Sequence, residues 1–88
     1  MNNKLYISWG IKMGEIRFVL DKTLREIGIT PHKLSLESKI RSNTIYSMIH
    51  NETKRIEIET LISLLDTLNS LANKKISVSD IFIYIQSK

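Results

Sequence analysis

Residues 30–51 read TPHKLSLESKIRSNTIYSMIHN, and this stretch decides the fold. Thr30 and Pro31 mark a helix start, because a threonine hydroxyl accepts from the free amides of a first turn and proline at the first helical position loses no hydrogen bond. Helical spacing of apolar residues then occurs twice, over about 31–38 and 42–50, with a connection of three or four residues. The stretch therefore predicts a helix-turn-helix motif.

The residues before the motif predict a strand and a first helix. A β-prone run near 16–18 is followed by helical spacing near 20–27. Gly28 then stands where a helix stops most easily, because glycine accepts a left-handed backbone. The first fourteen residues alternate apolar and polar side chains, a pattern typical of an extended chain with one buried face. We interpret residues 1–14 as a strand or a loosely ordered arm.

The residues after the motif predict a long helix and an ambiguous tail. A wide apolar stripe at helical spacing begins at Ile58 and ends near 69–73, which predicts the strongest helix of the chain. Ser77 and Asp80 fit a capping box at the head of a short helix. The run 81–85 is β-branched and aromatic, so we interpret the tail as a helical turn that leads into an extended end.

The composition fits one small domain. The chain has 88 residues, of which 42% are hydrophobic and 25% charged, and this is too short for two domains. The absence of cysteine excludes disulfides, thiolate zinc sites and cysteine nucleophiles. No apolar run reaches the roughly 18–20 residues of a membrane span, and the start lacks a secretory signal. We therefore expect a cytoplasmic protein with no membrane partner.

The net charge of +4 is concentrated on the motif. Residues 30–55 contain five lysines and arginines against two glutamates, a net charge of +3. Residues 56–73 contain three acidic residues and neither lysine nor arginine, a net charge of −3. A basic surface that coincides with a helix-turn-helix motif is the electrostatic signature of a nucleic-acid-binding protein.

The sequence gives little support to catalysis or metal binding. It contains no glycine-rich phosphate loop and no nucleophile elbow, and Glu57 with Glu59 fits the preference for acidic residues at a helix start. His32 and His50 are 18 residues apart with no further ligand at suitable spacing, so a zinc site is not expected. We expect no enzyme activity, no cofactor, no metal and no small-molecule ligand.

Several stretches in and around the motif together resemble a known family. They are Ile16 to Asp21, Leu34-Ser35, Ile40, Asn43-Thr44-Ile45, Asn51, Thr53 to Glu57 and Asp80 to Tyr84. The most specific is Thr53 to Glu57, which follows the second helix of the motif at the family's usual distance. Over about residues 15–70 the chain resembles the Cro/CI (XRE) family of helix-turn-helix transcriptional regulators, in particular its compact single-domain members.

The resemblance implies a fold and a division of the chain. The implied fold is mainly α, a five-helix lambda-repressor-like domain with a short N-terminal strand or arm, and it leaves a C-terminal strand open. The DNA-binding domain is then expected over residues 15–88, with the helix-turn-helix motif at about 31–50 and the arm over 1–14.

The chain departs from the family pattern at both ends of the second helix. Lys39 stands where the family commonly has glycine in the turn, which strains the left-handed conformation that the turn often uses. Arg41 stands at the usual serine or threonine cap, so the cap is expected to fall to Ser42. Asn51 replaces the glycine after the second helix and is the next-best residue for a positive φ.

The resemblance also implies sequence-specific binding of double-stranded DNA, with the 42–50 helix in the major groove. Three exposed polar residues match family positions that commonly meet base edges: Ser42, Asn43 and Ser47. Asn43 is the preferred candidate, because asparagine can bond to N6 and N7 of adenine together. Cations flanking the helix and one hydroxyl are expected on phosphate, where they neutralise backbone charge. They are Lys33, Arg41, Thr44, Lys54 and Arg55.

The expected partner besides DNA is a second copy of the chain. One motif of this size reads only a few base pairs, so useful affinity normally requires a symmetric homodimer. The arm Leu5 to Met13 and the tail Ile81 to Ile85 offer strand edges or apolar patches for it. Two alternatives stay open: an antitoxin or protein-interaction module built on the same fold, and a structural protein that has the motif without binding DNA.

Overall fold

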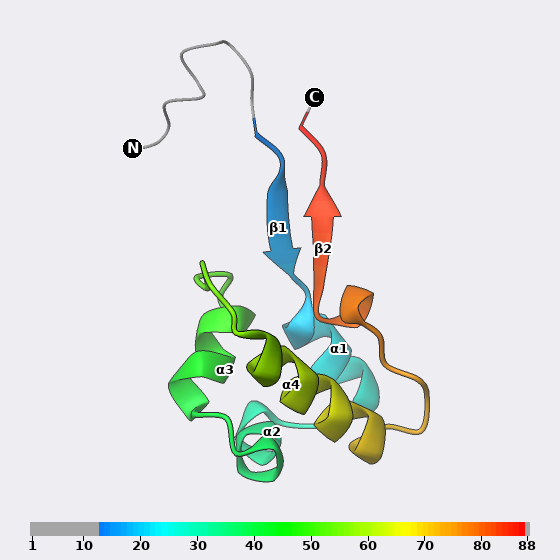
Figure 1. Ribbon diagram of the computed structural model, residues 1–88. Coiled ribbons are helices and arrows are strands. Elements are labelled where there is room, and N and C mark those ends of the chain that lie inside the picture. Colours follow the sequence, from blue (N-terminus) through cyan, green and yellow to red (C-terminus); the bar gives the residue numbers. More distant parts are fainter. Residues whose placement is uncertain (1–12, 88) are drawn as a thin grey trace.

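The protein is a helical body from which a two-stranded sheet projects (Figure 1). The computed structural model describes residues 13–87. In chain order the elements are β1 (Glu15–Phe18), α1 (Leu20–Ile27), α2 (Pro31–Ser38), α3 (Ser42–Ile49), α4 (Ile58–Leu71), the 3-10 helix η2 (Val78–Asp80) and β2 (Phe82–Ile85).

The structure confirms most of the predicted helix and strand positions. The helices α1 and α2 have the predicted bounds, α3 ends one residue earlier than expected, and α4 ends within the predicted interval. Thr30 caps α2 by accepting from the Lys33 N–H at 3.1 Å, and Gly28 ends α1 with a φ of 73°. Ser77 and Asp80 form the expected capping box, and the tail continues as β2.

Two expectations, the number of helices and the N-terminal arm, are not confirmed by the structure. The described residues form four α-helices and one three-residue 3-10 helix, so the expected count of five helices is not confirmed. The last helix stays short because Ile81 enters the core and the β-branched residues after it pair with β1. The strand or arm expected over 1–14 lies outside the described residues, except for Met13 and Gly14, which belong to no strand.

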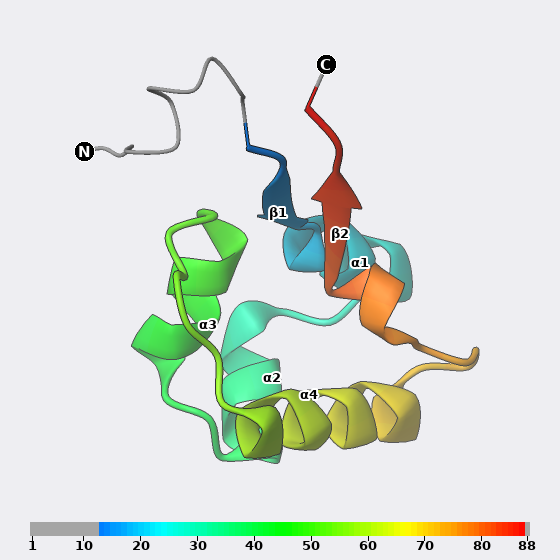
Figure 2. The same cartoon turned by 45° about the horizontal axis from the view of Figure 1, so that its top comes forward.

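The core lies between the four helices and the base of the sheet (Figure 2). Its buried apolar residues come from every helix and from both sides of η2: Leu20, Leu24, Leu34, Ile45, Met48, Leu64, Leu68, Ile76 and Ile81. Two hydrogen bonds join the first helix to the tail, because the Val19 N–H donates to the Ile81 carbonyl at 2.7 Å and the Thr23 hydroxyl donates to the Asp80 carbonyl. The two ends of the described chain are thereby fixed to the same body.

The sheet has one predominantly apolar face. β1 and β2 are antiparallel, with Ile16 opposite Tyr84 and Phe18 opposite Phe82. Opposed residues of an antiparallel pair point to the same side, so these four side chains share a face. The rings of Phe18 and Phe82 meet edge to face, with centroids 5.6 Å apart. Ile16 and Tyr84 stay 51% and 66% exposed, so the outer half of this face is open to solvent.

Serine hydroxyls hold the turn between α2 and α3. The Ser35 hydroxyl donates to the Ile40 carbonyl at 2.6 Å and lies 3.2 Å from the Ser42 hydroxyl. Arg41 occupies the N-cap position of α3 and makes no side-chain cap. The expectation that Ser42 caps α3 is therefore wrong, because Ser42 is already the first helical residue and its hydroxyl is directed to Ser35.

We expect Lys39→Gly to raise the free energy of unfolding by about 0.5–1 kcal/mol, which chemical denaturation measures. Lys39 has a φ of 63°, in the left-handed region that disfavours a Cβ atom. Its N–H, which donates to the Ser35 carbonyl at 2.9 Å, remains available in the glycine variant. The matched control is Glu37→Gly, inside α2, which should destabilise the protein. A loss of stability in Lys39→Gly would contradict the strained turn.

Candidate nucleic-acid interface

The helix α3 has one anchored face and one exposed face, as predicted. Ile45 and Met48 are completely buried and Ile49 is half-buried, so they fix the helix to the core. Asn43 and Tyr46 are exposed on the other side. The helix is therefore held rigidly from behind while its polar side chains remain accessible.

The three predicted base-contacting residues differ in how free they are. In the described part of the chain the Asn43 amide has no hydrogen-bond partner and is exposed. The Ser42 hydroxyl is also exposed but lies 3.2 Å from that of Ser35. The Ser47 hydroxyl also has no hydrogen-bond partner within the described residues, but Ser47 is half-buried. Asn43 has the freest hydrogen-bonding groups of the three.

Of the residues predicted to contact phosphate, some lie close together beside α3 and others do not. A hollow between the turn and the start of α4 is lined by Arg41 and Thr44, and a second hollow beside it is lined by Thr44 and Arg55. Lys54 is exposed next to Arg55, whereas Lys33 lies in the first turn of α2 and lines neither hollow.

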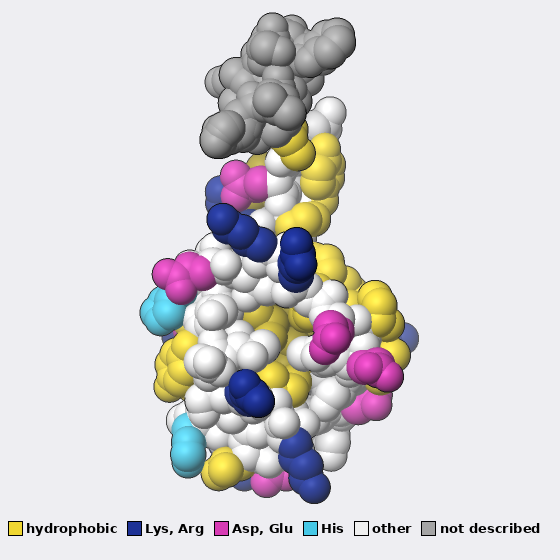
Figure 3. Space-filling model, turned by 60° about the vertical axis from the view of Figure 1, so that its left-hand side comes forward, with side chains coloured by type: hydrophobic (Ala, Val, Ile, Leu, Met, Phe, Trp, Pro, Cys, Tyr) yellow, Lys and Arg dark blue, Asp and Glu magenta, His cyan; other side chains and the backbone are white. Residues whose placement is uncertain are grey.

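An acidic side chain lies beside the residues predicted to contact phosphate. Glu57, the N-cap residue of α4, lines both of these hollows. Figure 3 shows the side of the molecule on which α3 lies: Lys and Arg side chains lie above, below and within an area of mostly uncharged surface, and acidic side chains lie toward its edges. The charge of this surface is therefore mixed, because cations and acidic side chains both lie on it.

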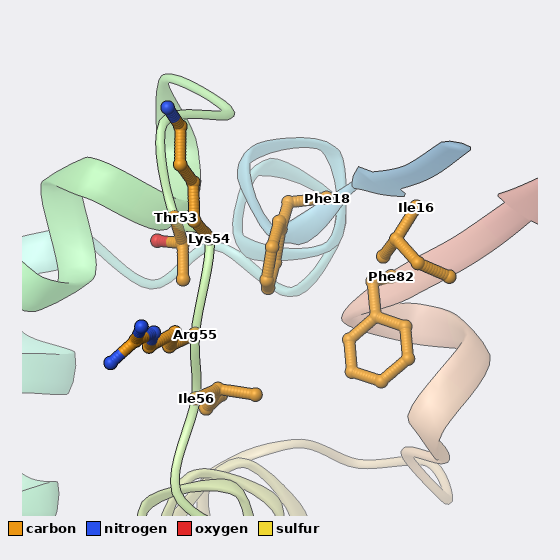
Figure 4. A pocket seen from close by; sticks show the side chains of 7 residues that line it. All are labelled: Ile16, Phe18, Thr53, Lys54, Arg55, Ile56 and Phe82. Carbon is orange, nitrogen blue, oxygen red and sulfur yellow. The ribbon is translucent and has the colours of Figure 1, made fainter. Parts of the chain in front are cut away.

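The loop between α3 and α4 lines one side of an apolar cavity. The cavity has a volume of about 200 Å³ and is lined by Ile16, Phe18, Thr53, Lys54, Arg55, Ile56 and Phe82. Figure 4 shows that the aromatic and aliphatic side chains face one another across it, whereas the charged ends of Lys54 and Arg55 point away. Both cations are thus presented to solvent by the segment that borders this cavity.

Two contacts near the end of α3 were not predicted. The rings of Tyr46 and His50 are stacked, with centroids 6.3 Å apart, and their spacing of four residues on a helix is the signal that could have revealed the pair. Asn51 has the predicted positive φ, 61°, but its side chain also bonds to the backbone of Phe18 in β1. No local pattern indicates that second contact, since the partners lie 33 residues apart.

Other classes of site receive no support from the described residues. Within 13–87 no group of three or more histidine, cysteine, aspartate or glutamate side chains could hold a metal ion. None of the helices described there has the length and apolar character needed to cross a membrane.

Comparison with known proteins matches the chain to a family of DNA-binding domains. The family model described as Cro/C1-type HTH DNA-binding domain matches residues 19–87. The matched region begins directly after β1 and includes the four α-helices, η2 and β2. No curated protein and no solved structure matches the chain.

Proposed function

The chain belongs to the family of Cro/C1-type HTH DNA-binding domains, and from this we propose that it is a sequence-specific transcriptional regulator that inserts α3 into the major groove of double-stranded DNA. The observation that carries the proposal is the division of α3 into two faces. Ile45 and Met48 anchor the helix completely, while Asn43 projects a free amide from its first turn. A major-groove helix needs this arrangement, since the groove admits an α-helix and its first turn reaches the base edges.

Base selection is assigned to three polar residues of α3. Asn43 is proposed to bond to adenine through its amide oxygen and nitrogen together, because no partner within the described residues competes for them. Ser42 is proposed as a second base contact, with a hydroxyl that can still accept while it donates to Ser35. Ser47, half-buried, is the third proposed contact and reaches the groove from the next turn.

Affinity is assigned to the residues around α3. Lysine and arginine that neutralise phosphate release counterions, which supplies most of the binding free energy without regard to sequence. The proposed phosphate contacts are Lys33, Arg41, Thr44, Lys54 and Arg55. Glu57 opposes them, so we expect affinity to depend on the exposed pair Lys54 and Arg55, whose charged ends point away from the cavity.

Titration with a random-sequence duplex at about 50 mM salt tests this function, because phosphate contacts alone give measurable affinity at that salt concentration. We expect binding that weakens steeply as salt is added. No binding at this concentration would reject DNA binding and favour the alternative of a protein-interaction module on the same fold.

Asn43→Ala is expected to lower the ratio of specific to random affinity about tenfold, within the range for one lost bidentate base contact. Random-duplex affinity should change little, because Asn43 carries no charge. Asn73→Ala is the matched control, an exposed asparagine beyond the far end of α4. The assignment requires an operator first selected from a random duplex pool, and an equal loss on both duplexes would contradict it.

We propose a homodimer, over a domain of residues 15–88, in which the C-terminal tail is one contact surface. The Val19 N–H donates to Ile81, and ladder alternation then directs the backbone groups of Phe82 and Tyr84 away from β1. An unpaired strand edge of this kind is a template for another strand. The arm 1–14 is the other proposed surface. A monomer at high micromolar concentration in analytical ultracentrifugation would contradict the dimer.

A further inference from the structure

The side chain of Asn51 pairs with β1 as a neighbouring strand would. The Phe18 N–H donates to Asn51 Oδ1 at 2.9 Å, and Asn51 Nδ2 donates to the Phe18 carbonyl at 3.3 Å. One amide thus satisfies both backbone groups of a residue at the outer edge of the sheet. These are the only hydrogen bonds recorded within residues 13–87 between the sheet and the segment that follows α3.

The backbone of the same residue ends α3. The Asn51 N–H donates to the Met48 carbonyl at 3.1 Å and the Glu52 N–H donates to the Ser47 carbonyl at 2.8 Å. With a φ of 61° at Asn51, these two bonds form a Schellman motif, the arrangement that stops a helix and turns the chain away. Asn51 is therefore the junction of three segments: the end of α3, the start of the loop and the last residue of β1.

Beyond this junction the loop has weak support. No backbone N–H from Thr53 to Ile56 donates to a backbone carbonyl within the described residues. The Thr53 hydroxyl is buried without a hydrogen-bond partner, and the cavity of about 200 Å³ lies beside the segment, between it and the sheet. Ile56 packs against the core, so the position of Thr53 to Arg55 depends on how this short stretch is held at its two ends, by Asn51 on one side and by Ile56 on the other.

We propose that Asn51 is a positioning residue for DNA binding: its amide fastens the end of α3 and the loop to β1, and this holds Lys54 and Arg55 where they contact phosphate. Asn51 need not touch DNA in this role. The inference rests on the proposed function, because it concerns the phosphate contacts of the same interface. In this proposal the sheet contributes to DNA binding indirectly, because β1 holds the loop through its bonds to Asn51.

Asn51→Gly separates the two roles of the residue. Glycine adopts a positive φ at least as easily as asparagine, so the end of α3 is preserved while both bonds to Phe18 are lost. We expect random-duplex affinity at about 50 mM salt to fall roughly three- to tenfold, and the slope of log K against log salt to lose about one unit, the share of one phosphate contact. Backbone ¹⁵N order parameters at Lys54 and Arg55, measured without DNA, should fall from about 0.85 toward 0.6.

Thr23→Val is the control for a general loss of stability. It removes one hydrogen bond, from the Thr23 hydroxyl to the Asp80 carbonyl, that joins α1 to the tail and does not touch the loop. This variant should keep the salt slope and the order parameters at Lys54 and Arg55. Unchanged order parameters in Asn51→Gly, or an equal fall in both variants, would overturn the proposal. If the wild-type protein fails to bind DNA, the proposed function is rejected and the role of Asn51 in DNA binding with it. The order parameters still decide separately whether Asn51 holds Lys54 and Arg55 in place.

Discussion

Leu64→Ala is expected to lower the free energy of unfolding by about 2–5 kcal/mol, the range for a large core residue replaced by alanine. Leu64 is completely buried in the middle of α4, against side chains from the other helices. A domain of this length has a total stability of only about 4–13 kcal/mol, and the chain has no disulfide to add to it. Urea denaturation followed by circular dichroism measures the loss as a lower transition midpoint.

Ile62→Ala is the matched control on the same helix. Ile62 lies two residues earlier and is 50% exposed, so it gives up far less buried surface. We expect this variant to lose less than about 1 kcal/mol, partly offset by the better helix propensity of alanine. Equal losses in the two variants would contradict the packing of α4, because the face that contacts the core would then not be the one described.

Combined replacement of Lys54 and Arg55 by alanine is expected to weaken specific and random DNA binding together, by about a hundredfold at 50 mM salt. The slope of log K against log salt should lose about two units, one for each phosphate contact. The reason is that both side chains are exposed and direct their charge away from the cavity below them. Duplex titrations at four or five salt concentrations give affinity and slope together.

Lys74→Ala combined with Lys75→Ala is the charge-matched control. These lysines follow the far end of α4, about 20 Å from its start along a fourteen-residue helix, so they remove the same net charge from another part of the surface. We expect a small change in affinity and an unchanged slope. If the two double variants lose affinity equally, net charge and not the loop accounts for binding. A loss of specificity on replacing Lys54 and Arg55, without a loss of random affinity, would reverse the roles assigned to these residues and to Asn43.

The helices could be predicted from the sequence because their ends carry local signals. Thr30-Pro31 begins α2 and Gly28 ends α1 through backbone preferences that act within a single turn. The left-handed conformations of Lys39 and Asn51 were expected from the family resemblance, because the family commonly has glycine at both positions. The anchored face of α3 followed from apolar spacing alone.

The features that sequence did not yield depend on contacts between distant residues. The end of the tail was predicted to be extended, but its partner was not predicted, because β1 lies 64 to 70 residues earlier in the chain. Ser42 was expected to cap α3, but the nearby hydroxyl of Ser35 gives it a different partner. The bonds between Asn51 and Phe18 exist only once the helices have packed, so no local pattern contains them.

The pairing of β1 with β2 has a consequence for the order in which the chain folds. The helix pairs form contacts that are close in sequence, whereas the sheet joins the first and last described elements and closes most of the chain into a loop. Closing a long loop is slow compared with forming local contacts, so the sheet is expected to assemble after the transition state. During synthesis β1 leaves the ribosome before α1 to α4, and its partner strand β2 follows only after them. While the residues between the two strands are being made, the backbone groups of β1 that later pair with β2 therefore have no partner strand.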